Sequence, residues 1–188
     1  MWWLEQDRTR RLAVRLACIA FFGGLAAGCF QPLYGSVSLT NSPPIAPALA
    51  GVDVAQIAEP GGSSIARVAV EVRNELLFNL TGGAEPPPPT HRLAIQMTSS
   101  RISVVVDIVS GRPDTEQYGL NVTYTLTEIK TGKPVVTGFT FARVSYDIPG
   151  QAQRFARERA LRDSEDRAAK LIADNIRTRL ASYFVAGT

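Results

Sequence analysis

Few side chains of this 188-residue chain combine the types and the spacing that catalysis or metal binding requires. His91 is the single histidine, and neither a cysteine nor an acidic cluster accompanies it at the spacing of a metal site. It lies just after the proline run Pro86–Pro89, which favours a solvated loop. We therefore expect no metal site at His91.

The acidic residues near the C-terminus are a second candidate for chemistry. They alternate with arginines on an expected helix, as Asp163, Glu165 and Asp166 among Arg157, Arg159, Arg162 and Arg167. Spacings of three and four residues suit surface ion pairs, whereas a catalytic pair of carboxylates needs two different environments within a cleft. The sequence also lacks a Gly-rich phosphate loop, a nucleophile elbow and an SxxK motif. It therefore predicts a protein that is not an enzyme and needs no cofactor.

The N-terminal segment has the composition of an export signal. Arginines between positions 8 and 15 precede the apolar run Leu16–Ala27, which is too short to span a membrane. The segment ends in Leu25–Gly28, directly before Cys29, and resembles the lipobox of bacterial lipoproteins. That resemblance implies cleavage before Cys29, a thioether to diacylglycerol and an N-acyl chain such as palmitate. Residues 1–28 are then the signal peptide.

The expected address is the periplasmic side of the outer membrane, because Phe30 stands where retention in the inner membrane goes with Asp. Several acyl chains suffice for stable anchoring, which one chain does not give. Two alternatives stay open: an ordinary secretory signal with an incidental Cys29, or an uncleaved anchor interrupted by Gly23, Gly24 and Gly28.

The net charge argues against a nucleic-acid partner. The leader holds four of the 20 basic residues and two of the 17 acidic ones, so the remaining chain is near +1. In a nearly neutral domain, any binding of a polyanion depends on local basic patches rather than on the net charge. Cys18 leaves with the leader, so no disulfide can form within the mature chain.

The rest of the chain is expected to begin with a lipidated tether over residues 29–50, followed by a single domain over 51–188. Val52–Ile57 alternates as a half-buried strand does. A helix then starts at Ser63 or Ser64 and buries Ile65, Val68, Val72, Leu76 and Leu80. Gly82, Gly83 and the prolines that follow end it.

Three strands and a long helix follow. The strands are Arg92–Ser100, extended by Ile102–Val109, then Gly119–Ile129 and Val135–Val144, with turns at 110–113 and 130–133. Phe139 and Phe141 are expected to point inward. The final helix runs from near Ala152 to Phe184, with an apolar stripe of Phe155, Leu161, Ala168, Leu171, Ile176, Leu180 and Phe184.

The order of these elements, β-α-β-β-β-α, predicts an α+β fold. Short connections between consecutive strands favour antiparallel pairing. Placing both helices on one face of a mainly antiparallel four-stranded sheet buries the apolar surfaces economically, in a two-layer sandwich.

Three segments identify a family when their order and spacing are combined with the lipobox. They are Cys29–Gly35 after the cleavage site, Val72–Phe78 with Thr81–Gly83 in the first helix, and Ile176–Phe184 at the end of the last. Together they resemble LptE, the lipopolysaccharide-assembly lipoprotein family of Gram-negative outer membranes, in its alphaproteobacterial form. The resemblance covers essentially the whole mature chain.

The resemblance implies that the protein plugs and assists assembly of LptD, a large outer-membrane β-barrel, and binds lipopolysaccharide. A barrel lumen is polar, and the expected sheet has a face of hydroxyl and amide groups to suit it, from Gln96, Thr98, Ser99, Thr123, Thr125 and Thr127. Phosphates of lipopolysaccharide favour basic partners. The candidates lie on or beside the strands: Arg92, Arg101, Lys130, Lys133 and Arg143. An ordinary solvated face would explain the same residues.

Two other classes of function remain open. The domain could be a lipoprotein accessory to another envelope machine, for barrel assembly or peptidoglycan synthesis. It could instead be a periplasmic ligand-binding or enzymatic module, for which an apolar pocket with convergent polar groups is expected.

Overall fold

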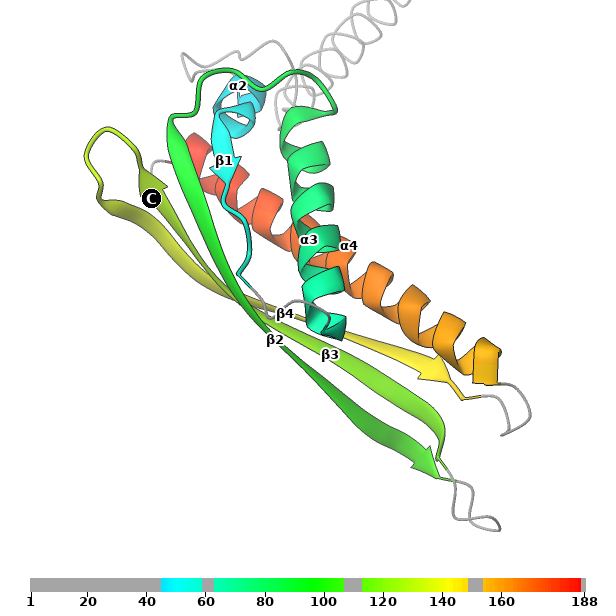
Figure 1. Ribbon diagram of the computed structural model, residues 1–188. Helices are drawn as coiled ribbons and strands as arrows, with labels where there is room; N and C mark the ends of the chain where they lie inside the picture. Colours follow the sequence, from blue (N-terminus) through cyan, green and yellow to red (C-terminus); the bar gives the residue numbers. More distant parts are fainter. Residues whose placement is uncertain (1–44, 59–62, 107–112, 149–153, 187–188) are drawn as a thin grey trace, which may run out of the picture. The chain divides into compact units, whose positions relative to one another are not determined.

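The computed structural model describes residues 45–58, 63–106, 113–148 and 154–186 (Figure 1). Several predicted features lie outside the described residues: the export signal, Cys29, tether residues 30–44, positions 107–109 of the predicted strand, positions 110–112 of the turn after it, and the predicted start of the last helix at residues 152–153. The chain divides into two units, Met1–Pro44 and Ile45–Thr188, and the fold below is that of the second. Among the described helices, none has the length and hydropathy of a membrane span.

The second unit is an α+β domain, as the sequence predicts, built on a four-stranded mixed sheet. Strand order is β1-β2-β3-β4, with β1 parallel to β2 and antiparallel pairing elsewhere. The elements are α2 (Ile45–Ala50), β1 (Val52–Val54), α3 (Ser64–Thr81), β2 (His91–Val106), β3 (Pro113–Glu128), β4 (Pro134–Asp147) and α4 (Arg154–Ala186). A parallel pair needs a crossover, which α3 provides between β1 and β2.

Helix α2 occupies a part of the chain that the sequence assigns to the tether. Its six residues pack against α3 and α4, and Leu49 is buried. The Gly51 amide donates to the Pro47 carbonyl at the end of this helix. Leu49 contributes to the core, which the proline-rich composition of the segment conceals.

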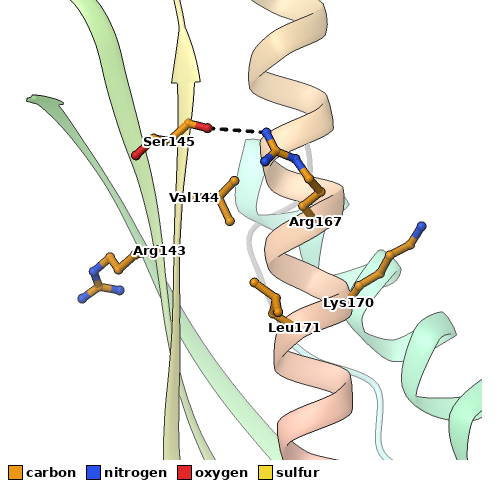
Figure 2. Close-up of a pocket in the computed structure, with 6 residues that line it drawn as sticks. All are labelled: Arg143, Val144, Ser145, Arg167, Lys170 and Leu171. Carbon is orange, nitrogen blue, oxygen red and sulfur yellow. Dashed lines mark hydrogen bonds between the residues drawn. The ribbon is translucent and has the colours of Figure 1, made fainter. Parts of the chain in front are cut away.

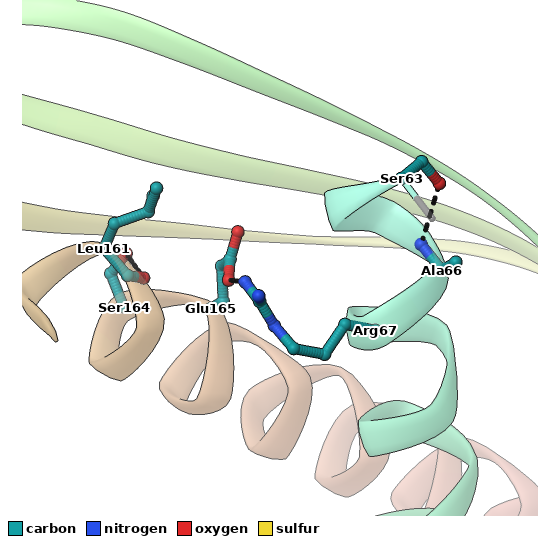
Figure 3. A network of polar contacts seen from close by, with 6 residues as sticks. All are labelled: Ser63, Ala66, Arg67, Leu161, Ser164 and Glu165. Carbon is teal, nitrogen blue, oxygen red and sulfur yellow. Dashed lines mark hydrogen bonds and ion pairs between the residues drawn. The ribbon is translucent and has the colours of Figure 1, made fainter. Parts of the chain in front are cut away.

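Helix α3 starts and stops as its sequence predicts. The Ser63 side chain accepts a hydrogen bond from the Ala66 amide, which is the usual N-cap arrangement (Figure 3). At the other end Gly82 is left-handed, with φ of 65°, and its amide donates to the Phe78 carbonyl. Between these caps, Val68, Val72, Leu76 and Leu80 are buried as predicted, and Ile65 is half-buried.

Helices α3 and α4 cover the same face of the sheet and leave its other face open (Figure 1). The predicted inward residues of β2 and β3 are confirmed in the core: Leu93, Ile95, Met97, Val122, Tyr124 and Leu126. The alternate positions, including Gln96, Thr98 and Thr123, are exposed. Ser99 is an exception to the expected polar face, because it pairs with the buried Leu120 and lies on the helix side. The two faces of the sheet therefore differ as the alternation predicts.

Strand β4 has the opposite phase to the one expected. Phe139 and Phe141 are 62% and 57% exposed and lie on the open face. The positions that face the helices at mid-strand are Gly138 and Thr140, and both are small because neighbours fill the space. A Cβ on Gly138 would lie 2.4 Å from the Tyr124 hydroxyl oxygen, and Thr140 accepts a hydrogen bond from Asn175 of α4.

Helix α4 also buries a somewhat different stripe from the predicted one. Ala168, Ile176 and Leu180 are buried as expected, but Phe155 is 87% and Leu171 48% exposed. A period near 3.6 residues selects Ile172 rather than Leu171, since it continues through Ile176 and Leu180. Small residues fill the rest of the contact and allow close approach: Ala169, Ala173 and Ala181.

Two carboxylates are buried under the N-terminal half of α4. Glu165 pairs with Arg67 of α3 (Figure 3), so the expectation of a surface ion pair is wrong for this residue. That expectation is confirmed for Asp163, which bonds to Arg167 four residues on. The second buried carboxylate, Glu116, accepts from the Tyr146 hydroxyl and from Arg157. Burial is the largest cause that raises the pKa of Tyr146 to about 12, and the hydrogen bond from Tyr146 to Glu116 is the second.

Candidate functional site

The open face of the sheet is the surface that the helices leave for other molecules. The strand register places its residues in rows, such as Gln96–Thr123–Phe139 and Thr98–Asn121–Phe141. The next row is Ser100–Gly119–Arg143. In these three rows the face is polar over β2 and β3 and largely aromatic along β4, which is an outer strand of the sheet. Further along β2, Ile102 and Val104 are also exposed.

Arg143 is held in place on this face by neutral groups. Its guanidinium donates to the Asn121 side-chain oxygen at 3.0 Å and to the Ala142 carbonyl at 3.0 Å. The guanidinium carbon also lies 5.3 Å from the centre of the Phe141 ring, within range of a cation–π interaction. The side chain passes over Gly119, where a Cβ would come within 3.2 Å of it.

The two phenylalanines form a continuous aromatic surface beside Arg143. The ring centres of Phe139 and Phe141 are 6.3 Å apart with planes tilted by 33°. Sequence reasoning missed both residues as surface groups, because it assigned them to the core. The signal that could have placed them is the apolar set Val136, Val144 and Tyr146, which fixes the phase of the strand.

The other candidate cations are not gathered around Arg143. Arg92 lies near the start of β2, far along the strand from Ser100, which shares a row with Arg143. There Arg92 bonds to Asp53 of β1 at 3.2 Å. Lys130 and Lys133 belong to the exposed β3–β4 hairpin, which lies at the same end of the sheet as Arg92. This hairpin confirms the predicted turn, since the Glu128 amide donates to the Lys133 carbonyl and Gly132 has a φ of 67°.

Arg101 lies near Arg143 along the strands but belongs to the opposite face. It pairs with Tyr118, whose side chain is in the core, and Tyr118 in turn pairs with Val144. Its charge lowers the pKa of Tyr118 and Tyr146 against the larger raising effect of burial. The five candidates therefore fall into three places: the hairpin end, the open face at Arg143 and the helix side at Arg101.

A hollow of about 440 Å³ lies at the outer edge of β4, beside α4 (Figure 2). Arg143, Val144, Ser145, Arg167, Lys170 and Leu171 line it. The Arg167 guanidinium reaches the Ser145 carbonyl, whereas the Arg143 side chain extends away from α4. Because these cations diverge, the hollow does not form an anion cage, and Arg143 serves the open face.

The sequence predicts that His91 lies in a loop, and this is wrong. In the structure His91 is the first residue of β2. Its ring packs edge-on against Phe184 at 5.2 Å, and the Thr90 hydroxyl lies 2.9 Å from Nδ1. Burial lowers the pKa of His91 against the raising effect of Glu128. The described residues contain no group of three or more potential metal ligands.

The fold and this surface define a class: a two-layer α+β domain in which none of the described helices covers the second face of the sheet. A crystal structure of a lipoprotein from Caulobacter crescentus CB15 has the same fold, with a TM-score of 0.59 at 21% identity. The match covers 76% of this chain and 96% of the Caulobacter chain. The model of the LptE family, described as lipopolysaccharide-assembly, matches residues 49–180. The chain belongs to the LptE family.

Two further lipoproteins of known structure are similar over 70% of this chain, each with a TM-score of 0.49. They are a minor lipoprotein from Acinetobacter baumannii, at 13% identity and 88% of its length, and rare lipoprotein B from Shewanella oneidensis, at 15% and 93%. No significant match was found among curated proteins. Family membership confirms the prediction that the chain is not an enzyme, because this family has a non-enzymatic role in lipopolysaccharide assembly.

Proposed function

We propose that this protein is a lipoprotein anchored by acylated Cys29 to the periplasmic side of the outer membrane. There it plugs and assists assembly of an LptD-like β-barrel and binds lipopolysaccharide on its way to the outer leaflet. Membership of the LptE family is the observation that carries this proposal. The lipobox-like segment before Cys29 supports the anchor.

The physical properties of the domain support a plug. Residues inside a large outer-membrane barrel meet a polar wall. The open sheet face suits that environment through hydroxyl and amide groups, and its three strands each contribute exposed polar positions. The opposite face is covered by helices whose outer surfaces carry mixed charges, including the Asp163–Arg167 pair.

Isolation of the full lipoprotein from its own outer membranes in mild detergent tests the partnership. We expect a large β-barrel protein to co-purify at a fixed stoichiometry, as measured by mass spectrometry of the complex. Recovery of the lipoprotein without a barrel, or with cell-wall enzymes, would refute the plug and favour an accessory role in another envelope machine.

Lipopolysaccharide binding is tested separately, on the purified lipoprotein. Lys133 and Arg143 are the candidates that differ most in setting, one at the hairpin and one fixed on the open face. Reversal of both charges, Lys133→Glu with Arg143→Glu, should weaken binding of intact lipopolysaccharide. Unchanged binding would exclude these two residues as contacts.

A further inference from the structure

We propose that Phe139, Phe141 and Arg143 form a platform that recognises the phosphorylated saccharide of lipopolysaccharide rather than its acyl chains. We refer to these three residues as the β4 platform. The inference rests on the proposed lipopolysaccharide binding and specifies the site and the part of the molecule that it contacts.

The first observation is an arginine fixed by neutral partners. Arg143 is held by the amide oxygen of Asn121, by a backbone carbonyl and by the Phe141 ring, none of which is anionic. Arg92, by contrast, bonds to the carboxylate of Asp53. Within the part of the chain that the structure describes, Arg143 therefore has no anionic partner and keeps a fixed orientation, and a guanidinium of this kind suits the oxygens of a phosphate.

The second observation is the pair of exposed aromatic rings. A sugar ring presents C–H groups on its faces and hydroxyl groups around its edge. The C–H faces pack on aromatic rings, whose faces carry partial negative charge. Phe139 and Phe141 present such rings next to each other, with centres 6.3 Å apart, on the strand that carries Arg143.

The third observation is the composition of the adjoining rows. Side chains with hydroxyl or amide groups lie directly across β3 and β2 from the two phenylalanines: Asn121 and Thr123, then Thr98 and Gln96. These groups donate and accept hydrogen bonds at the height of the rings. None of the described open-face residues in the three rows from Gln96, Thr98 and Ser100 is acidic, so nothing there repels a phosphate.

The same features disfavour acyl chains as the ligand of this face. Burial of an alkyl chain requires a concave apolar surface. The phenylalanines instead stand on a sheet face whose neighbouring side chains are polar, where an acyl chain would desolvate hydroxyl and amide groups. A phosphorylated saccharide satisfies both kinds of group.

The test uses the full lipoprotein in detergent, purified with its acyl chains, and calorimetric titration with three probes. The probes are intact lipopolysaccharide, the fully deacylated phosphorylated oligosaccharide made from it, and the same oligosaccharide after phosphatase treatment. We expect the wild type to bind the deacylated phosphorylated probe, and to bind the dephosphorylated one about tenfold more weakly.

Two variants assign the effect to the β4 platform. Phe139→Ala with Phe141→Ala should weaken both oligosaccharide probes about tenfold, since both lose their aromatic contacts. Arg143→Gln should abolish the difference between the phosphorylated and dephosphorylated probes. The matched controls are Phe78→Ala on α3, where the ring is 63% exposed, and Arg159→Gln on α4, and both should bind like the wild type.

Gly119→Ala provides a third, independent variant. The added Cβ would lie 2.6 Å from Ser100 Oγ and 3.2 Å from a guanidinium nitrogen of Arg143, so both side chains must move. Both have room to do so on the open face, and the domain should remain folded. We expect this variant to lose phosphate discrimination while leaving Arg143 present.

The outcomes separate this inference from the proposed function. Binding of intact lipopolysaccharide without binding of the deacylated phosphorylated probe would overturn the saccharide assignment and leave the proposed function standing. Oligosaccharide binding that resists all platform variants would overturn the site. Failure to bind intact lipopolysaccharide would refute both proposals.

Discussion

Gly138 is the position whose replacement most directly tests the phase of β4. The residue pairs with Tyr124 of β3, and an added Cβ would lie 2.4 Å from the tyrosine oxygen and 2.5 Å from Cζ. Tyr124 is only 4% exposed, so its ring cannot turn out into solvent. The Gly138→Ala variant therefore forces about 1 Å of movement on a packed ring before normal contact distances are restored.

The expected cost follows from overpacking. Extra methyl groups in a packed core typically cost about 1–3 kcal/mol. Alanine recovers roughly 0.5–1 kcal/mol, because glycine loses more chain entropy than alanine in a strand. Because a packed ring must move, the upper part of that range applies, about 2–3 kcal/mol, and the net loss is about 1–2.5 kcal/mol. For a domain of this size that corresponds to a fall in Tm of roughly 3–8 °C.

Calorimetric unfolding of the described domain within the full chain measures this effect. Thr137→Ala, one residue away and exposed, is the matched control and should change stability by less than about 0.5 kcal/mol. Adding Tyr124→Leu to Gly138→Ala should recover part of the loss, so the two changes should not be additive. A Tm for Gly138→Ala equal to that of the wild type would refute the placement of Gly138 against Tyr124.

Three further predictions concern other parts of the chain. Because the pKa of Tyr146 is raised to about 12 beside Glu116, stability should fall between pH 10 and 12, by at most about 1.4 kcal/mol per pH unit. Urea unfolding at pH 9 and 11 should show that Tyr146→Phe loses less stability between these two pH values than the wild type does. Arg67→Met leaves Glu165 buried without its cation and should cost about 1–3 kcal/mol, since Arg67 itself is half exposed. Adding Glu165→Gln to Arg67→Met should restore part of the lost stability. No recovery in the double variant would contradict the ion pair between Arg67 and Glu165. Cys29→Ser should release the protein from outer membranes on fractionation, whereas unchanged membrane association would argue against lipidation.

The sequence predicts the elements of the fold well because their signals are local. The caps of α3 at Ser63 and Gly82, the turn at Gly132 and the alternation of β2 and β3 each depend on residues within a few positions. Helix α2 is not predicted from local signals, because the burial of its one buried side chain, Leu49, depends on packing against α3 and α4.

The errors in β4 and α4 arise from contacts that are distant in sequence. The presence of Phe139 and Phe141 in β4 favours a prediction in which these aromatic residues are buried. In the structure Gly138 faces the helices instead, because Tyr124 already fills the space beneath it. Glu165 is likewise charged and one turn from surface residues, yet it faces Arg67 about a hundred positions earlier. Such positions are determined by which elements meet, and sequence periodicity does not contain that information.

The exposed aromatic side chains of β4 also bear on its function. A long outer strand with exposed aromatic side chains is a hazard for aggregation. More than half of the surface of each ring is exposed, so the two rings contribute less to the core than buried aromatic residues do. Polar residues at 139 and 141 would match the remainder of the open face. The aromatic pair is instead placed beside an arginine that Asn121 orients and that Gly119 leaves room to cross the sheet. Because five neighbouring positions combine to expose a fixed cation next to two rings, the proposed recognition of an anionic saccharide explains the strand better than stability does.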